Sequence, residues 1–439
     1  MVNPIVFGEN LASAIFAFNR LKAGLDVSIG ADHDLSTKFA GVQFGSQTVD
    51  RGMVLIEPQR SNYPKFDISK YSGECRANAL PFLGTVSEWF QKCNLTLDQA
   101  QISMLFRGML LKDFFIADSL NVMHQFSGQE QKSIRNELES SIKKLDKNNH
   151  PRKKYQNKWY EENRYLEISR LLHGSTLTEV LLSPYLYKVY GMDAEKLVAS
   201  EHRSAWAPFY FPESILGCLN GEETGIEEKT FVYPSRIGFS EFISQMELYV
   251  NKNVSRNAIS FENLESGLSK PDQENKVVAY FESPKKLNQM ETFDTQYIKG
   301  RCIYIKAYAP ITKTVFIVDL EWHAFRLNLR NGESATDGYV CVEFGVAASH
   351  QSNENLIQES LKLCRFFEVE VESRSAMVFE CRYPLRTRQS EGLFENMHNA
   401  IRILRDRGMY GYPIFELNGS INDQICAANA TYSEIERLD

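Results

Sequence analysis

The first thirty residues carry the pattern that most constrains the fold of this chain. A short apolar run at residues 5–7 ends at Gly8, and helix-compatible apolar residues follow over 11–21. An extended apolar pattern then resumes at 27–29, after a glycine that stops the helix. A strand–glycine–helix–strand unit of this kind is the usual opening of a doubly wound dinucleotide-binding domain. We therefore expect residues 5–29 to form two parallel strands flanking a helix.

Length and charge limit what such a domain is part of. A chain of 439 residues exceeds the roughly 250–300 residues of a single core, so we expect two or three interwoven domains. The balance of 49 basic and 56 acidic residues disfavours a nucleic-acid partner. We find no apolar run long enough to span a membrane and no signal-peptide pattern. Eight cysteines without paired spacing predict reduced thiols in a cytoplasmic protein, without a metal site.

The rest of the chain divides into a helical middle and a β-rich later part. Apolar spacing of three and four residues predicts helices at 85–90, 97–109 and 166–172. The basic stretch at 143–158 is interpreted as a solvated helical hairpin in preference to an anion-binding patch, because no aromatic residue interrupts it before Tyr155. Further helices are predicted up to residue 249, at 356–366 and at 393–404, and strands at 277–281, 302–308, 314–319 and 339–344.

The first turn matches only one glycine of the dinucleotide-binding motif GxGxxG. Gly8 is the matching glycine, while Asn10 and Ser13 stand at the other two glycine positions. Asn10 is a favourable residue for capping the helix that follows. Glu9 places a carboxylate where a phosphate would meet the helix. Asp32 follows the second strand late, and is interpreted either as a ribose ligand or as a surface-loop residue.

Several later segments, taken in chain order, resemble one protein family. They are Asp50-Arg51-Gly52, residues 174–177 leading to 183–193, Tyr233-Pro234 with Gly238, Ala309-Pro310, and residues 408–423. This series is similar to the motifs of the flavin-containing amine oxidase superfamily, particularly its protoporphyrinogen-oxidase-like and UDP-galactopyranose-mutase-like branch. The most specific match is 183–193, where Tyr190 stands at the usual tryptophan.

The resemblance implies an α/β architecture with an FAD-type, Rossmann-like three-layer domain. That domain would comprise residues 1–75, 230–280 and 370–439, with a helical insertion at 76–229 and a β-rich substrate domain at 281–369. The implied activity is an FAD-dependent oxidoreductase or a flavin-dependent mutase acting on a nucleotide-sugar, glycan or small secondary metabolite. The implied cofactor-binding residues are Gly8, Asn10, Leu11, Ser13, Asp32, Gly52, Gly411, Ile421 and Asn422.

The departures from the family pattern lead to a second hypothesis. Two motif glycines and the usual acidic residue are replaced, and Ser36-Thr37 stands where the family has a glycine pair. Each change removes either a close backbone approach or a ribose partner. FAD is therefore expected to bind weakly or not at all. A flavin-free member of the fold that binds a ligand or a protein partner is the alternative.

Two arginines are the main candidates for substrate binding. Arg326 and Arg330 are placed on one face of a strand by alternation, where two guanidiniums suit a small anionic substrate. The competing interpretation is a solvated strand face with cross-strand ion pairs. Tyr185 and Arg203 are predicted to line the same cleft. His323 is a weak candidate for a general base, with a structural role as its alternative.

Overall fold

The computed structural model describes most of the chain. The described residues are 3–30, 39, 41–58, 86–112, 121–147, 163–199, 205–222, 230–235, 237–256, 277–282, 293–332, 338–389, 393–414 and 420–438. Asp32, Ser36-Thr37 and Arg203 lie outside them, and so does the end of the basic stretch beyond residue 147. Within the described part, no helix is both long and apolar enough to cross a membrane.

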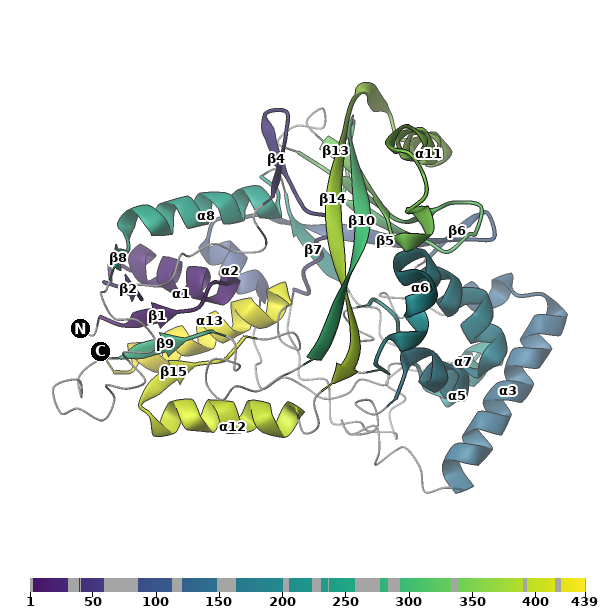
Figure 1. The fold of residues 1–439 in the computed structure, drawn as a ribbon, viewed down its shortest axis with the longest axis horizontal. Helices are drawn as coiled ribbons and strands as arrows, with labels where there is room; N and C mark the ends of the chain where they lie inside the picture. The colour runs from purple at the N-terminus through teal and green to yellow at the C-terminus, as the bar shows by residue number, and fades with distance from the viewer. Residues whose placement is uncertain are drawn as a thin grey trace.

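A five-stranded parallel sheet contains both ends of the chain (Figure 1). Its first two strands flank helix α1 (Leu11–Lys22) and pair in parallel, as predicted. Each strand is short and most positions are buried, which is typical of a parallel sheet covered on both faces. In spatial order the strands are β15 (Met409–Gly411), β9 (Val278–Tyr280), β1 (Ile5–Phe7), β2 (Ser28–Ile29) and β8 (Ser255–Arg256).

Helices cover both faces of this sheet, which gives three layers. Alternate residues of β1 and β9 face opposite ways, so Val6 packs into one apolar cluster and Phe7 into another. The first cluster is shared with α1, α2 (Val86–Lys92), α8 (Phe239–Asn253) and α13 (Ile421–Glu436), and the second with α12 (Leu393–Asp406). The FAD-type three-layer architecture is therefore confirmed.

A second, mostly antiparallel sheet forms the other half of the molecule. Its two longest strands cross the front of the molecule in Figure 1. The spatial order is β14 (Val371–Gln389), β10 (Phe293–Ala307), β13 (Gly338–Phe344), β12 (Ala324–Arg330), β11 (Lys313–Ile317), β5 (Leu97–Phe106) and β6 (Met109–Lys112), with β7 (Phe231–Pro234) on β5. Helix α11 (Asn353–Phe366) shares an apolar cluster with this sheet, and the hairpin β3 (Val42–Phe44) and β4 (Gln47–Val49) lies beside it.

Two expectations about this sheet are wrong. The segment 97–109, predicted as a helix, forms β5, because its apolar side chains also alternate and β11 pairs with it in parallel. Strand β14 falls within 370–439, which was assigned to the nucleotide-binding domain, yet it belongs to the antiparallel sheet. The long ladder with β10 decides this assignment, and only tertiary pairing reveals it.

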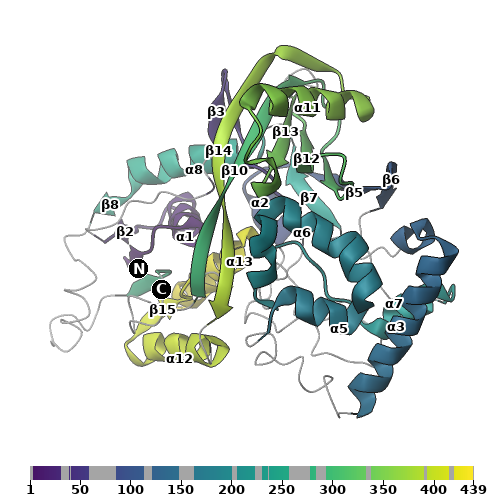
Figure 2. The same ribbon diagram turned by 45° about the vertical axis from the view of Figure 1, so that its right-hand side comes forward.

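The predicted helical middle is a group of helices (Figure 2), and its apolar core is shared with strands of the antiparallel sheet, among them β5, β11 and β12. The helix predicted at 166–172 is confirmed as α5. Of the stretch 143–158, predicted to be a solvated helical hairpin, the structure describes only residues 143–147, which form the end of α3. The elements are η2 (Asn121–Gln125), α3 (Gly128–Lys147), α5 (Tyr165–Leu177), the π-helical turn η3 (Thr178–Leu182), α6 (Ser183–Tyr190), η4 (Gly191–Lys196) and α7 (Pro212–Leu219).

Candidate functional site

The start of α1 is the position at which this fold class binds a dinucleotide diphosphate. Asn10 has extended backbone angles and caps the helix, as its residue type predicted. Its Oδ1 accepts a hydrogen bond from the backbone N–H of Ser13 at 3.1 Å. Its Nδ2 donates to the carbonyl oxygen of Phe281, at the end of β9, at 2.7 Å. The side chain at the second glycine position therefore ties the helix to the neighbouring strand.

The space beside Gly8 is filled by the same group of side chains. Gly8 has a φ of +136°, and a Cβ added to it would lie 2.6 Å from Ser13 Oγ. Ser13 and Leu11 are both fully buried, so this turn presents little side-chain surface to a ligand. Glu9 is exposed beside it and adds a negative charge to the edge. The turn is thus compact and closed on its inner side.

A residue far along the sequence bonds a second backbone amide in the first turn of α1. Gln424, in the first turn of α13, accepts a hydrogen bond at its Oε1 from the backbone N–H of Ala12 at 3.2 Å. Helix α13 begins at Ile421 and has its own cap, because Ser420 Oγ accepts from the N–H of Asp423 at 3.2 Å. Asn422 is buried, and its Oδ1 has no hydrogen-bond partner among the described residues.

The ends of the neighbouring strands are also tightly packed. A Cβ added at Gly30, just after β2, would meet the ring of Phe7 at 2.4 Å. Gly411, in β15, has a φ of +110°, and an added Cβ would lie 2.3 Å from the carbonyl oxygen of Tyr280. Two amides of the first helical turn are already bonded to side chains. The residues present at this edge, as arranged, therefore do not fit an FAD diphosphate held at the start of α1.

A second region of interest lies where Asp50 meets the antiparallel sheet. Asp50 is 1% exposed. Its Oδ2 accepts from Tyr233 Oη at 2.6 Å, and its Oδ1 from the N–H of Ser240 at 3.0 Å. The hydroxyl of Tyr339 accepts from the N–H of Asp50, while the hydroxyl of Tyr304 donates to its carbonyl oxygen at 2.8 Å. Burial and the neighbouring Asp50 carboxylate hold the pKa of Tyr233 well above its ordinary value.

Arg326 is held in a buried ion pair within this region. Its Nε and Nη2 each donate to the Glu343 carboxylate at 2.7 Å, which is bidentate geometry. Asn328 and Tyr383 donate to the same carboxylate at 2.7 and 3.1 Å. Gly52 has a φ of +77° and lies so close that an added Cβ would be 2.9 Å from Glu343 Oε2. Of the guanidinium nitrogens of Arg326, Nη1 has no hydrogen-bond partner among the described residues.

Arg330 lies on the same face of β12, as alternation predicted. It is fully buried, and its Nε lies 3.8 Å from Asp50 Oδ2. Its Nη2 donates to the carbonyl oxygen of Val54 at 3.2 Å, and its guanidinium carbon lies 5.0 Å from the ring centroid of Tyr233. Both arginines thus face carboxylates of the chain itself. The arrangement corresponds to the alternative interpretation of the two arginines, a strand face with ion pairs, except that these ion pairs are buried and not solvated.

The other predicted residues lie in different surroundings. His323 precedes β12, is 38% exposed, and its Nδ1 lies 2.8 Å from Glu359 Oε2 of α11. Glu359 also accepts from the backbone N–H of His323 at 2.7 Å, so this pair fastens α11 to the sheet. Tyr185 is 1% exposed, with ring centroids 5.7 Å from Phe316 and 6.1 Å from Phe325.

Sequence reasoning missed Glu343 and Gln424. Glu343 carries the only charge in a strand that is otherwise apolar except for its tyrosine and glycine, and a carboxylate in such a strand signals a buried partner. Gln424 has no comparable local signal, because its contact spans 412 positions of the chain.

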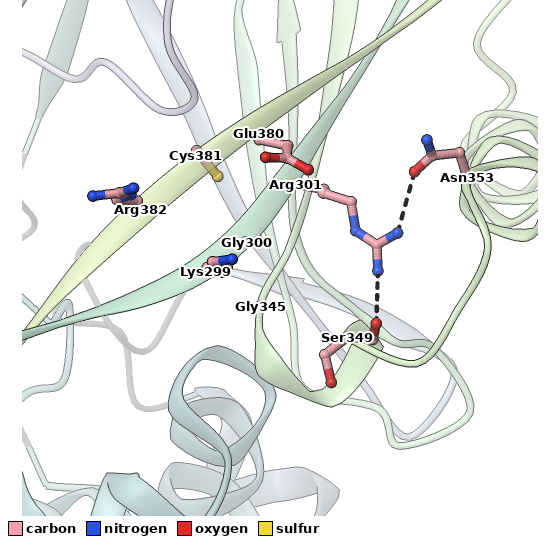
Figure 3. A pocket seen from close by; sticks show the side chains of 9 residues that line it. All are labelled: Lys299, Gly300, Arg301, Gly345, Ser349, Asn353, Glu380, Cys381 and Arg382. Carbon is pink, nitrogen blue, oxygen red and sulfur yellow. Dashed lines mark hydrogen bonds between the residues drawn. The ribbon is translucent and has the colours of Figure 1, made fainter.

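A groove of about 690 Å³ opens along β10 and β14 (Figure 3). Arg301 is anchored there by hydrogen bonds to the carbonyl oxygens of Ala348, Ser349 and Gln351. Lys299 and Arg382 are exposed and lie directly opposite each other in the ladder. Like charges in that position are unfavourable. The residues that line the groove are Lys299, Gly300, Arg301, Gly345, Ser349, Asn353, Glu380, Cys381 and Arg382.

Comparison with known proteins shows the fold. No family model matches the sequence, and neither does a curated protein. Among solved structures, reduced UDP-galactopyranose mutase superposes with a TM-score of 0.58 at 12% identity, over 100% of this chain and 94% of that one. Cyclohexylamine oxidase from Brevibacterium oxydans IH-35A superposes with a TM-score of 0.52 at 11% identity, over 100% and 99%. Over its whole length, the chain therefore shares the fold of these two structures, as its ordered motifs predicted.

Proposed function

We propose that this protein is a flavin-free member of the fold and that it acts by binding a partner. The observation that carries the proposal is the cap of α1. Asn10 occupies the second glycine position with hydrogen bonds at both ends of its amide, to Ser13 and to Phe281. Gln424 takes the amide of Ala12. A diphosphate bound at this helix would have to displace both side chains.

The cost of that displacement is large enough to matter. Loss of an asparagine cap costs about 1 kcal/mol. The bonds to Phe281 and from Ala12 each contribute about 1 kcal/mol more. Together they oppose diphosphate binding by about 3 kcal/mol, which is about a hundredfold in affinity. The exposed carboxylate of Glu9 acts in the same direction.

The buried network around Asp50 and Glu343 supports the same proposal. It consists of two internal ion pairs and their tyrosine partners, and it joins the loop after β4 to the antiparallel sheet. Each arginine of the network faces a carboxylate of the chain itself, so we assign the network the role of holding this loop on the sheet. We therefore place partner binding on the outer surface. Lys299 and Arg382 are exposed there and form no ion pair within the described residues.

Flavin content tests the proposal directly. The purified protein should lack the absorbance bands of oxidised flavin, and titration with FAD up to about 100 μM should leave flavin fluorescence unquenched. A yellow protein with one FAD per chain would refute the proposal. The double variant Glu9→Ala with Asn10→Gly measures the barrier. If it gains FAD, the cap is what excludes the cofactor; if it stays colourless, the site is lost more broadly.

A matched control separates the cap from the effect of a new glycine. Asn94 is exposed and has a φ of 60°, which glycine adopts without strain. Asn94→Gly should leave both folding and flavin binding unchanged. Any gain of flavin in the Asn10 variant then reports on the start of α1 alone.

An FAD-dependent oxidoreductase or flavin-dependent mutase is the second candidate. It is favoured by the full-length likeness to the two solved structures and by Asn422, whose buried Oδ1 has no hydrogen-bond partner in the described part of the chain. FAD would supply the electron chemistry, and the family resemblance implies a nucleotide-sugar, glycan or small metabolite as substrate. The same absorbance measurement decides between the two candidates.

A further inference from the structure

The groove along β10 and β14 concentrates positive charge on a chain whose net charge is −7 (Figure 3). Lys299 and Arg382 lie directly opposite each other in a part of the ladder with continuous register, so both side chains project from the same face. The Cβ atoms of such a pair are about 4.5–5.5 Å apart. Both residues are exposed, and neither forms an ion pair within the described residues. The two cationic groups can therefore reach one anion placed between them.

The opposite wall of the groove is held in position by Arg301. Its guanidinium donates to the carbonyl oxygens of Ala348 and Gln351 at 2.6 and 2.9 Å, and to Asn353 Oδ1 at 3.2 Å. These bonds fasten the loop before α11 to β10. Ser349 and Asn353 line the groove on this side, where their hydroxyl and amide are neutral hydrogen-bonding groups. The wall is thus in place before any ligand binds.

Glu380 restricts the kind of anion that the groove can accept. It lies two positions before Arg382 on the same face of β14, and it is exposed. Arg301, directly opposite Glu380, is engaged by the loop carbonyls, and Glu380 forms no ion pair in the described part of the chain. A second negative charge near Glu380 would be repelled. The groove therefore suits one compact anion at its Lys299–Arg382 end, and not a run of acidic side chains.

A phosphate monoester is the anion that matches this arrangement. It carries a charge of about −1.5 to −2 at pH 7 on a single group, which balances two cations, whereas a carboxylate balances one. A guanidinium such as that of Arg382 can bind phosphate with two parallel hydrogen bonds, and an ammonium such as that of Lys299 binds it as a point charge.

The place of the groove at the edge of the sheet indicates what carries the phosphate. Strand β14 is the end strand, with β10 as its partner among the described strands, until the carbonyl oxygen of Arg386 accepts from the N–H of Val198. Figures 1 and 2 show this ribbon along the outside of the molecule. Such an edge can pair with an extended segment of another chain. A residue opposite Arg382 in that pairing presents its side chain on the face of Lys299 and Arg382.

We propose that the groove binds a phosphorylated segment of a protein partner, extended along β14 beside the groove, with its phosphate monoester between Lys299 and Arg382. The assignment rests on the proposed partner-binding function and specifies the chemistry of the partner. Pairing with the edge of β14 supplies affinity, and the phosphate determines which segments bind. The volume of about 690 Å³ accommodates the phosphorylated residue together with its neighbours.

Fluorescence anisotropy with the full-length wild-type chain tests the proposal. The probe is a fluorescein-labelled peptide mixture with phosphoserine fixed at its centre and randomised residues on both sides. It should bind with a dissociation constant below about 100 μM. The same mixture with serine at its centre should bind at least tenfold more weakly. Free phosphoserine should also bind at least tenfold more weakly, because it cannot pair with the edge of β14.

Four variants locate the site. Lys299→Glu and Arg382→Gln should each weaken binding of the phosphoserine mixture at least tenfold. Glu380→Gln should strengthen it about threefold, because it removes the carboxylate that repels the phosphate. Lys132→Glu, an exposed reversal on α3, is the matched control for Lys299→Glu and should leave binding unchanged. Circular dichroism spectra and melting curves establish that each variant is folded.

The outcomes separate this proposal from its alternatives. It is overturned if the phosphoserine mixture does not bind at about 500 μM, if the serine mixture binds equally well, or if Lys299→Glu binds like the wild-type chain. Equal affinity for free phosphoserine would mean that the groove takes a small phosphate ester and not a partner segment. Flavin absorbance is measured on the same sample. A colourless protein that does not bind loses this assignment alone, whereas a yellow protein that binds the mixture refutes the flavin-free function.

Discussion

Replacing Arg326 with alanine removes one half of a buried ion pair and leaves the other half in place. Glu343 is 1% exposed, and it loses two charge-assisted hydrogen bonds of 2.7 Å. The bonds from Asn328 and Tyr383 remain, but they are neutral donors. An uncompensated buried charge of this kind typically costs 3–5 kcal/mol. The guanidinium also packs over the Phe325 ring at 5.2 Å, and that contact is lost as well.

We therefore expect Arg326→Ala to lower the free energy of unfolding by about 3–5 kcal/mol. Urea denaturation followed by circular dichroism measures this, with the dependence on urea concentration checked for constancy. Arg402→Ala, at an exposed position on α12, is the control and should change stability by no more than about 0.5 kcal/mol. A loss below about 1 kcal/mol for Arg326→Ala would refute the ion-pair reasoning. It would instead favour the original expectation, in which an anion-binding arginine contributes little to stability.

Three further predictions concern buried groups. Burial lowers the pKa of the His173 imidazole to about 3. Between pH 6.5 and 3, only the unfolded chain therefore binds this proton, and the free energy of unfolding should fall with falling pH by up to about 4–5 kcal/mol. His173→Gln should remove that part of the pH dependence in denaturation curves, and an unchanged slope would contradict the assignment. Gly52→Ala should cost about 1–3 kcal/mol more than Gly45→Ala, since both have positive φ but only Gly52 has a carboxylate within 3 Å of an added Cβ; equal melting temperatures would argue against this packing. Tyr233→Phe should cost about 1.5–3 kcal/mol by removing the 2.6 Å bond to Asp50, and a neutral effect in urea denaturation would mean that the bond is replaced by another donor.

The secondary structure with strong local periodicity could be predicted from the sequence. The unit over residues 5–29 and helix α11 appear close to where they were expected, because residues near in sequence decide an amphipathic helix and a short buried strand. Residues 97–109 were misread as a helix for the same reason. Their apolar spacing fits both periods, and pairing with β11, some 210 positions later, decides for a strand.

The roles of Arg326 and Arg330 show where local reasoning ends. Alternation placed both on one face of a strand, and that placement is correct. Whether the face meets solvent, a ligand or another strand depends on residues distant in sequence. Glu343 comes from the next strand in the sheet, and Asp50 comes from near the N-terminus. A guanidinium takes whichever carboxylate the fold brings to it, so its role could not be read from β12 alone.

At the start of α1, too, one hydrogen bond follows from the local sequence and others follow only from the tertiary structure. The sequence by itself determined that Asn10 caps the helix, because its side chain needs to reach only the amide three residues ahead. The bond from Asn10 to Phe281 and the bond from Ala12 to Gln424 join segments 271 and 412 positions apart. Only the packing of α13 beside α1, and of β9 beside β1, brings those groups within hydrogen-bonding distance. Because of that packing and the Asn10 cap, the amides of Ala12 and Ser13 at the start of α1 are bonded to side chains of the chain itself.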